Sequence, residues 1–98
     1  MRRGPLSVAY LAGDDQEPVR VAYAIGKRVG GAVVRNRLRR RLRAVLAELA
    51  DDPELLPSGA MVISAGPEVT GRTPDELRND VRSLLEALQR RRSAADAR

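Results

Sequence analysis

Residues 27–43 hold the side chains with the clearest chemical role in this sequence of 98 residues. The stretch contains eight cations: Lys27, Arg28, Arg35, Arg37, Arg39, Arg40, Arg41 and Arg43. No acidic residue lies between Glu17 and Glu48, so no nearby negative charge balances them. Helices with a purely structural role usually alternate charge signs, because opposite charges three or four residues apart stabilise them. The run therefore predicts that a polyanion, most simply a nucleic acid, supplies the missing charge.

Residue types that could support enzymatic catalysis are scarce. The sequence has no His and no Cys, which excludes imidazole bases, nucleophilic triads built on them, thiolate metal sites and disulfides. The acidic clusters at residues 14–17 and 51–54 lie in expected loops, where carboxylates serve turns and solubility. We therefore expect no catalytic residue and no bound metal or other cofactor in this chain.

The cationic run must be carried by a helix. Gly30 and Gly31 end an extended segment, and the pattern from residue 32 to residue 50 is helical. At about 100° per residue, one apolar stripe forms from Val34, Leu38, Leu42, Val45, Leu46 and Leu49. Arg35, Asn36, Arg39 and Arg43 follow one flank of this stripe. Arg37 and Arg41 follow the other flank, and Arg40 points away from the core.

Three strands are expected around this helix. Residues 6–12 and 19–26 alternate in the manner of strands, and their short connection favours an antiparallel hairpin. Val8 and Tyr10 share one face of the first strand. Residues 60–65 are apolar throughout, as in a strand that is buried on both faces.

A final helix is expected over residues 74–92. Thr73 is the N-cap, Pro74 takes the first helical position, and Glu76 completes a capping box. Arg90, Arg91 and Arg92 would then occupy the last turn, where either the helix dipole or RNA contact explains them. Residues 1–92 are expected to form one domain, and residues 93–98 a disordered tail.

The sequence GGAVVRNRLRRRLR, centred on Arg35, Asn36 and Arg37 and preceded by Lys27 and Arg28, resembles the signature of the bacterial ribonuclease P protein component. The resemblance covers nearly the whole chain. It implies an α+β fold, an α-β sandwich of the ribosomal protein S5 domain 2-like type with a left-handed crossover around the basic helix. The order expected here is β-β-(β)-α-β-α, without the helix that precedes the first strand in the family; the sequence leaves open whether that helix is truncated or truly lacking.

The resemblance also implies a function. The family protein assists a catalytic RNA that uses Mg²⁺ to remove the 5′ leader of precursor tRNA, in a 1:1 complex of protein and RNA. The residues expected to face the leader are Arg35, Asn36, Arg39, Arg43, Val8 and Tyr10. The residues expected to face the catalytic RNA are Lys27, Arg28, Arg37 and Arg40.

Composition leaves two alternatives open. One is an interaction module whose basic helix binds acidic protein or anionic lipid, although the helix lacks the large aromatic residues usual on membrane-facing helices. The net charge of +5 and the pI of about 10.9 also suit a generic ribosomal or DNA-binding protein with no role in cleavage. No apolar run is long enough for a transmembrane helix, and we expect no membrane partner. A cytoplasmic location is expected from the absence of Cys.

Overall fold

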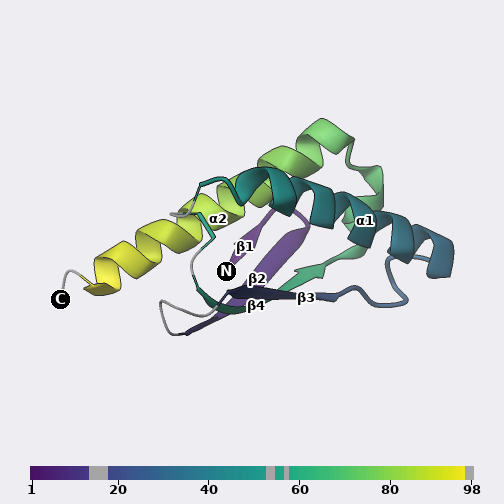
Figure 1. The fold of residues 1–98 in the computed structure, drawn as a ribbon. Helices are drawn as coiled ribbons and strands as arrows, with labels where there is room; N and C mark the ends of the chain where they lie inside the picture. The colour runs from purple at the N-terminus through teal and green to yellow at the C-terminus, as the bar shows by residue number, and fades with distance from the viewer. Residues whose placement is uncertain (14–17, 53–54, 57, 97–98) are drawn as a thin grey trace.

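The computed structural model describes residues 1–13, 18–52, 55–56 and 58–96. In chain order, its elements are the strands β1 (Arg2–Arg3), β2 (Leu6–Ala12) and β3 (Val19–Ala24), helix α1 (Ala32–Leu49), strand β4 (Gly59–Ala65), the short 3₁₀ helix η1 (Pro67–Gly71) and helix α2 (Pro74–Asp96). Both long helices cover the same face of the sheet (Figure 1). The α+β class is confirmed.

The strand order in the sheet is β1-β2-β4-β3. Strand β4 pairs antiparallel with β2 and parallel with β3, so that Met61 lies between Tyr10 and Val21. The expected hairpin between β2 and β3 is therefore wrong, because β4 occupies the place between them. The short strand also comes first in the chain, as β1, and not directly before the basic helix.

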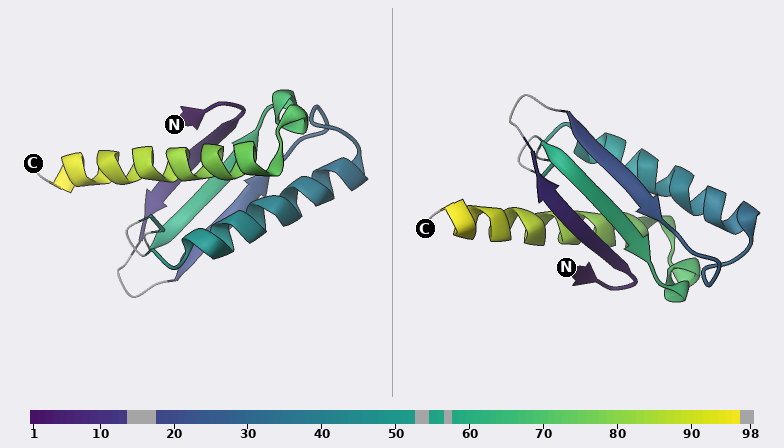
Figure 2. Two further views of the ribbon diagram at one scale, coloured as in Figure 1. Left: turned by 90° about the horizontal axis from the view of Figure 1, so that it is seen from above. Right: turned by 90° about the horizontal axis from the view of Figure 1, so that it is seen from below.

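The β3–α1–β4 connection is left-handed. In the view from above in Figure 2, the helices lie in front of the sheet, and β4 lies to the left of β3 when the strands point upward. About 98% of such crossovers in proteins are right-handed. The handedness implied by the family resemblance is thus present in this chain.

Side-chain alternation separates the two faces of the sheet. Leu6 and Val8 of β2, with Met61 and Ile63 of β4, are buried under the helices. The intervening residues face away from the helices, and Leu11 is 73% exposed there. The core also takes Leu38, Leu42, Val45, Leu46 and Leu49 from α1, and Leu77, Val81, Leu84, Leu85 and Leu88 from α2.

Gly59 permits the close approach of β4 to the end of β2. Its φ angle is +128°, which side-chain-bearing residues rarely adopt, and a Cβ atom there would collide with the carbonyl oxygen of Leu11. Burial of Leu55 confirms that the loop before β4 helps to cover the core.

Local signals set the start of α2. The Thr73 amide donates to Glu76 Oε1 at 3.0 Å, and the Glu76 amide donates to Thr73 Oγ1 at 3.2 Å, which confirms the capping box. The helix continues to Asp96, so residues 93–96 belong to it and not to the expected tail. Residues 97 and 98 lie outside the described part of the chain.

Candidate nucleic-acid interface

Helix α1 is anchored by its C-terminal two-thirds. Leu38 and Leu42 are buried, as are the apolar residues that follow them on the same stripe. Val34 belongs to the predicted stripe but is 39% exposed, since the first turns of α1 extend beyond the strands (Figure 1). The N-terminal end of α1 is therefore open to a partner.

The start of α1 is also electropositive. Its N-cap is Gly31, which has no side chain to accept from the first amides, and its first turn holds no acidic residue. The unpaired amides and the helix dipole give this end a partial positive charge. Lys27 and Arg28 are exposed in the turn that leads into it, and their charges add to that of the helix end.

Charge pairing differs between the cations of residues 27–43 and two arginines near the start of α2. Arg72 pairs with Asp80 at 2.9 Å and with Glu76 at 3.3 Å, and Arg78 pairs with Glu48 at 3.1 Å. By contrast, none of the eight cations of residues 27–43 forms an ion pair with a carboxylate of the described residues. The fold thus neutralises Arg72 and Arg78 and leaves the cations of the basic run available.

One flank of α1 faces strand β3. Arg43 places its guanidinium carbon 5.7 Å from the ring centroid of Tyr23 on β3. One turn earlier, Arg39 Nη1 donates to Asn36 Oδ1 at 3.0 Å. The Nε atom of Arg35 is buried and has no hydrogen-bond partner among the residues that the structure describes. We call Arg35, Asn36, Arg39 and Arg43 the β3-side flank; the structure keeps the four together, as their spacing predicted.

The opposite flank faces η1. Arg37 and Arg41 line a pocket there together with residues of the turn before α1 and of η1. Arg40, which lies between the two flanks, is exposed. Cations of α1 therefore point in several directions, as the sequence predicted.

Val8 and Tyr10 lie elsewhere, under α2. They line a groove of about 540 Å³ with Met1, Ala9, Leu88, Arg91 and Arg92, which we call the β2–α2 groove. Val8 is only 6% exposed and belongs to the core, so it offers little surface to RNA, and its expected contact with the leader stays a prediction. The alternation of β2 was predicted correctly, but a period of two does not tell which face the helices cover.

Tyr10 is held by two contacts that the sequence did not reveal. Its hydroxyl donates to the carbonyl oxygen of Ser58 at 2.7 Å. The guanidinium carbon of Arg92 lies 5.8 Å from its ring centroid. Tyr10 thus contacts α2, and strand β4 separates its strand from β3, which the β3-side flank approaches.

Sequence reasoning missed the contact made by Tyr23 and misread Arg91 and Arg92. Tyr23 supports Arg43, and only the fold brings these two together. Arg91 and Arg92 line the β2–α2 groove, and α2 has no basic residue in its last turn because it extends to Asp96. The helix-dipole explanation of Arg90, Arg91 and Arg92 is therefore wrong.

Burial alters one titrating group near this surface. Partial burial raises the pKa of Tyr23 above its ordinary value, and the positive charge of Arg43 acts in the opposite direction. Tyr23 therefore stays protonated at neutral pH. Among the described residues, no three or more His, Cys, Asp or Glu side chains come together in a group that could hold a metal ion.

Sequence comparison decides the family. The sequence model of the family described as Ribonuclease P matches residues 1–89. The ribonuclease P protein component of Beutenbergia cavernae is 46% identical over 85 residues, which are 87% of this chain and 70% of that protein. The chain belongs to the ribonuclease P protein component family. The corresponding protein of Mycobacteroides abscessus is 42% identical over 82 residues, which are 84% of this chain and 63% of that protein.

Solved structures of ribonuclease P proteins share the fold. The Staphylococcus aureus RNase P protein aligns with a TM-score of 0.74 at 17% identity, over 86% of this chain and 74% of that one. The Thermotoga maritima protein aligns with a TM-score of 0.73 at 17% identity, over 89% and 80%. This chain spans 63–71% of the length of three similar ribonuclease P protein components. No helix in the described part of the chain combines the length and the apolar character needed to cross a bilayer.

Proposed function

We propose that this chain is the protein subunit of a ribonuclease P. In this proposal it binds the catalytic RNA and the 5′ leader of precursor tRNA, and so assists removal of the leader in the cytoplasm. The observation that carries the proposal is that the cations of residues 27–43 form no ion pair with any carboxylate that the structure describes, in a protein that pairs Arg72 and Arg78 with its own carboxylates. Family membership supplies the identity of the partner.

Electrostatics gives the protein its role in this scheme. Two RNAs repel each other, and each phosphate that binds an arginine releases condensed counterions, which favours association. The chain has seventeen Arg and one Lys, and the planar guanidinium can hold two phosphate oxygens at once. Because α1 presents cations in more than one direction, one helix can contact two RNA segments.

In this proposal the leader and the catalytic RNA contact different sides of α1. The leader contacts the β3-side flank, where Asn36 and Arg39 are already joined by a hydrogen bond. Tyr10 contacts the leader at the β2–α2 groove, and Val8 lies at the floor of that groove. The catalytic RNA contacts Lys27, Arg28, Arg37 and Arg40, which are all exposed.

Chemistry at the phosphodiester belongs to the RNA subunit in this proposal. The Mg²⁺ ions are held by RNA, and the protein stabilises their sites indirectly by drawing the two RNAs together in a 1:1 holoenzyme. The side chains described here bind and orient RNA; none of them is assigned a proton transfer.

Reconstitution tests the proposal. The protein is added to a bacterial ribonuclease P RNA at low Mg²⁺ concentration, and cleavage of precursor tRNA is measured. We expect the protein to raise cleavage at the correct 5′ position. A protein that binds RNA and duplex DNA equally well, and leaves cleavage unchanged, would instead be the generic nucleic-acid binder.

Paired double variants test how the RNAs are divided. Arg35→Ala with Arg39→Ala removes two cations of the β3-side flank, and we expect it to weaken binding of precursor tRNA by about 2- to 30-fold more than binding of mature tRNA. The control, Arg37→Ala with Arg40→Ala, removes two cations of the same helix and should affect both substrates alike. Equal losses for both tRNAs in the first variant would contradict the leader assignment.

A further inference from the structure

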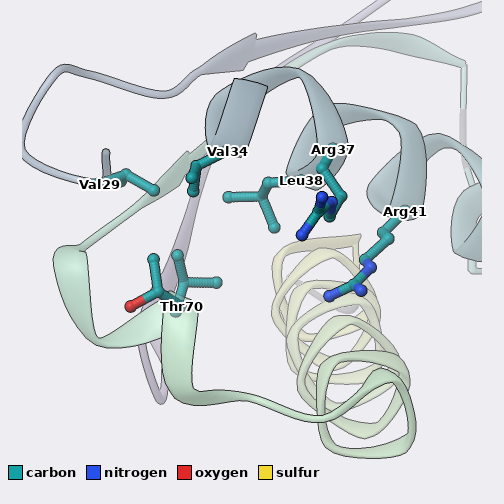
Figure 3. Close-up of a pocket in the computed structure, with 7 residues that line it drawn as sticks. Val29, Val34, Arg37, Leu38, Arg41 and Thr70 are labelled. Carbon is teal, nitrogen blue, oxygen red and sulfur yellow. The ribbon is translucent and has the colours of Figure 1, made fainter. Parts of the chain in front are cut away.

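A small pocket lies between the start of α1 and η1 (Figure 3). Its volume is about 240 Å³. Its lining comes from three separate segments, namely Val29 before α1, Val34, Arg37, Leu38 and Arg41 from α1, and Val69 and Thr70 from η1. Neither the leader contact nor the β2–α2 groove uses this pocket.

The floor and one wall of the pocket are apolar. Val29, Leu38 and Val69 are buried and form part of the core. Val34 stands at the opening and is 39% exposed, although it continues the apolar stripe of α1. Gly30 leaves space beside it, because a Cβ atom at Gly30 would lie 3.0 Å from the Val34 side chain. The core of the protein does not cover this apolar surface completely. A flat, apolar group can therefore pack against it.

The rim of the pocket is cationic. Arg37 and Arg41 come from successive turns of α1 and extend on the same side of it (Figure 3). Both are exposed, and neither pairs with any carboxylate that the structure describes. Across the opening, the Thr70 hydroxyl donates to the Pro67 carbonyl oxygen at 3.0 Å, which leaves its own oxygen free to accept a hydrogen bond. The pocket thus combines an apolar floor, one polar acceptor and two free cations.

The volume of the pocket limits the size of the ligand that it can bind. Sites for drug-sized molecules usually measure about 300–1,000 Å³, so a pocket below that range suits one ring system. A planar ring next to a negative group matches the arrangement of the lining. Unpaired bases of RNA have this form: they are commonly turned out of the strand and held against side chains while arginines bind the adjoining phosphates.

We propose that the pocket receives one unpaired nucleobase of a single-stranded RNA segment, whose flanking phosphates bind Arg37 and Arg41. The base packs against Val34 and Leu38, and Thr70 accepts a hydrogen bond from a base amino group. The inference rests on the proposed function and adds to it a point where the protein holds a base as well as phosphates.

Methyl NMR spectroscopy of the whole chain tests occupancy directly. The probes are a short single-stranded oligoadenylate, adenosine 5′-monophosphate, and ribose 5-phosphate, which has no base. We expect the oligoadenylate to shift the methyl signals of Val34, Leu38 and Thr70 upfield through the adenine ring current, at lower concentration than the mononucleotide. Ribose 5-phosphate should leave those methyl signals in place. Equal shifts from all three probes, or mononucleotide binding as tight as that of the strand, would overturn the proposal.

A matched pair of variants gives an independent measurement. Val34→Trp fills the pocket, whereas Val33→Trp introduces the same side chain one residue earlier, at a position that is 72% exposed and outside the pocket lining. We expect Val34→Trp to bind the oligoadenylate about 3- to 10-fold more weakly than Val33→Trp. An abasic strand with the same phosphates should bind both variants equally. Equal oligoadenylate affinities would refute the base site, while stimulation of precursor tRNA cleavage by the unaltered protein would still support the proposed function.

Discussion

Arg43 of α1 lies over the ring of Tyr23 on β3, with 5.7 Å between the guanidinium carbon and the ring centroid. The Tyr23 ring contacts only one face of this guanidinium, so the N–H groups at the guanidinium edge remain able to bind phosphate. The contact holds a long, flexible side chain above the edge of the sheet. Ordering Arg43 in advance reduces the entropy that RNA binding would otherwise cost.

The first prediction concerns the ionisation of Tyr23. Replacing Arg43 with Ala removes the positive charge that favours the phenolate, so we expect the pKa of Tyr23 to rise further above its ordinary value. Absorbance titration in a Tyr10→Phe background reports Tyr23 alone, within the pH range where circular dichroism remains native. Arg78→Ala serves as the control, since Arg78 pairs with Glu48. A Tyr23 titration that is the same with and without Arg43 would show that the contact is absent in solution.

The second prediction concerns salt dependence. Arg40 is exposed and without an acidic partner among the described residues, so Arg40→Ala should reduce the slope of log K against log salt concentration by about 0.7–0.9. Arg78→Ala also removes one charge, but that charge is already paired with Glu48. Its slope should match that of the unaltered protein. Titrations of ribonuclease P RNA at several salt concentrations measure both slopes, and similar slopes for the two variants would count against the unpaired-charge argument.

The third prediction is that one substitution at Arg40 raises stability and weakens RNA binding. Arg37 and Arg43 lie three residues on either side of Arg40, and like charges at this spacing destabilise a helix. At low ionic strength, Arg40→Glu should increase the free energy of unfolding by about 1 kcal/mol, because two repulsive pairs become attractive. Denaturant unfolding should show that this gain shrinks at high salt. The same variant should bind RNA more weakly; a variant that gained in both properties would contradict the assigned role of Arg40.

The fourth prediction concerns acid stability. Hydrogen bonding with the Thr73 backbone is the largest cause that lowers the pKa of Glu76, and hydrogen bonding with the Thr73 side chain is the next largest. The positive charge of Arg72 lowers this pKa further. A carboxylate with a lowered folded-state pKa stabilises the protein above its unfolded pKa, and the contribution is lost as the pH falls through the folded value. Glu76→Gln should therefore lower the melting temperature at neutral pH and match the unaltered protein in strong acid.

A double variant checks the cause of that effect. Thr73→Ala removes the hydroxyl that accepts from the Glu76 amide, and loss of such a cap usually costs about 1 kcal/mol. If the two residues act as one capping box, the combined variant should lose less than the sum of the single losses. Additive losses would indicate that Glu76 acts through Arg72 instead.

Short-range signals were enough to predict the helices. Thr73, Pro74 and Glu76 are consecutive or nearly so, and their contacts form as the sequence indicated. The apolar stripe from Leu38 to Leu49 also follows directly from the helical period. Val34 is the exception, because its place depends on where the sheet ends and not on the helix alone.

Long-range relationships were not predictable in the same way. Nothing local to β2 or β3 indicates that a strand formed by residues 59–65 separates them. The alternation of β2 correctly placed Val8 and Tyr10 on one face, but it could not show that α2 covers this face and buries Val8. The pocket at Arg37 and Arg41 needs Val69 and Thr70, which lie far along the chain.

The central place of β4 has a consequence for synthesis of the protein. In the described sheet, β3 pairs with β4 and with no other strand, and most of β2 also depends on β4 for its ladder. The ribosome adds residues at about 5–20 per second, so β3 waits about 2–8 seconds for its partner strand to be translated. During this interval the arginine-rich segment has already been made, before the strand that completes its platform. The cations of α1 are therefore present in the growing chain before the sheet that positions them can form.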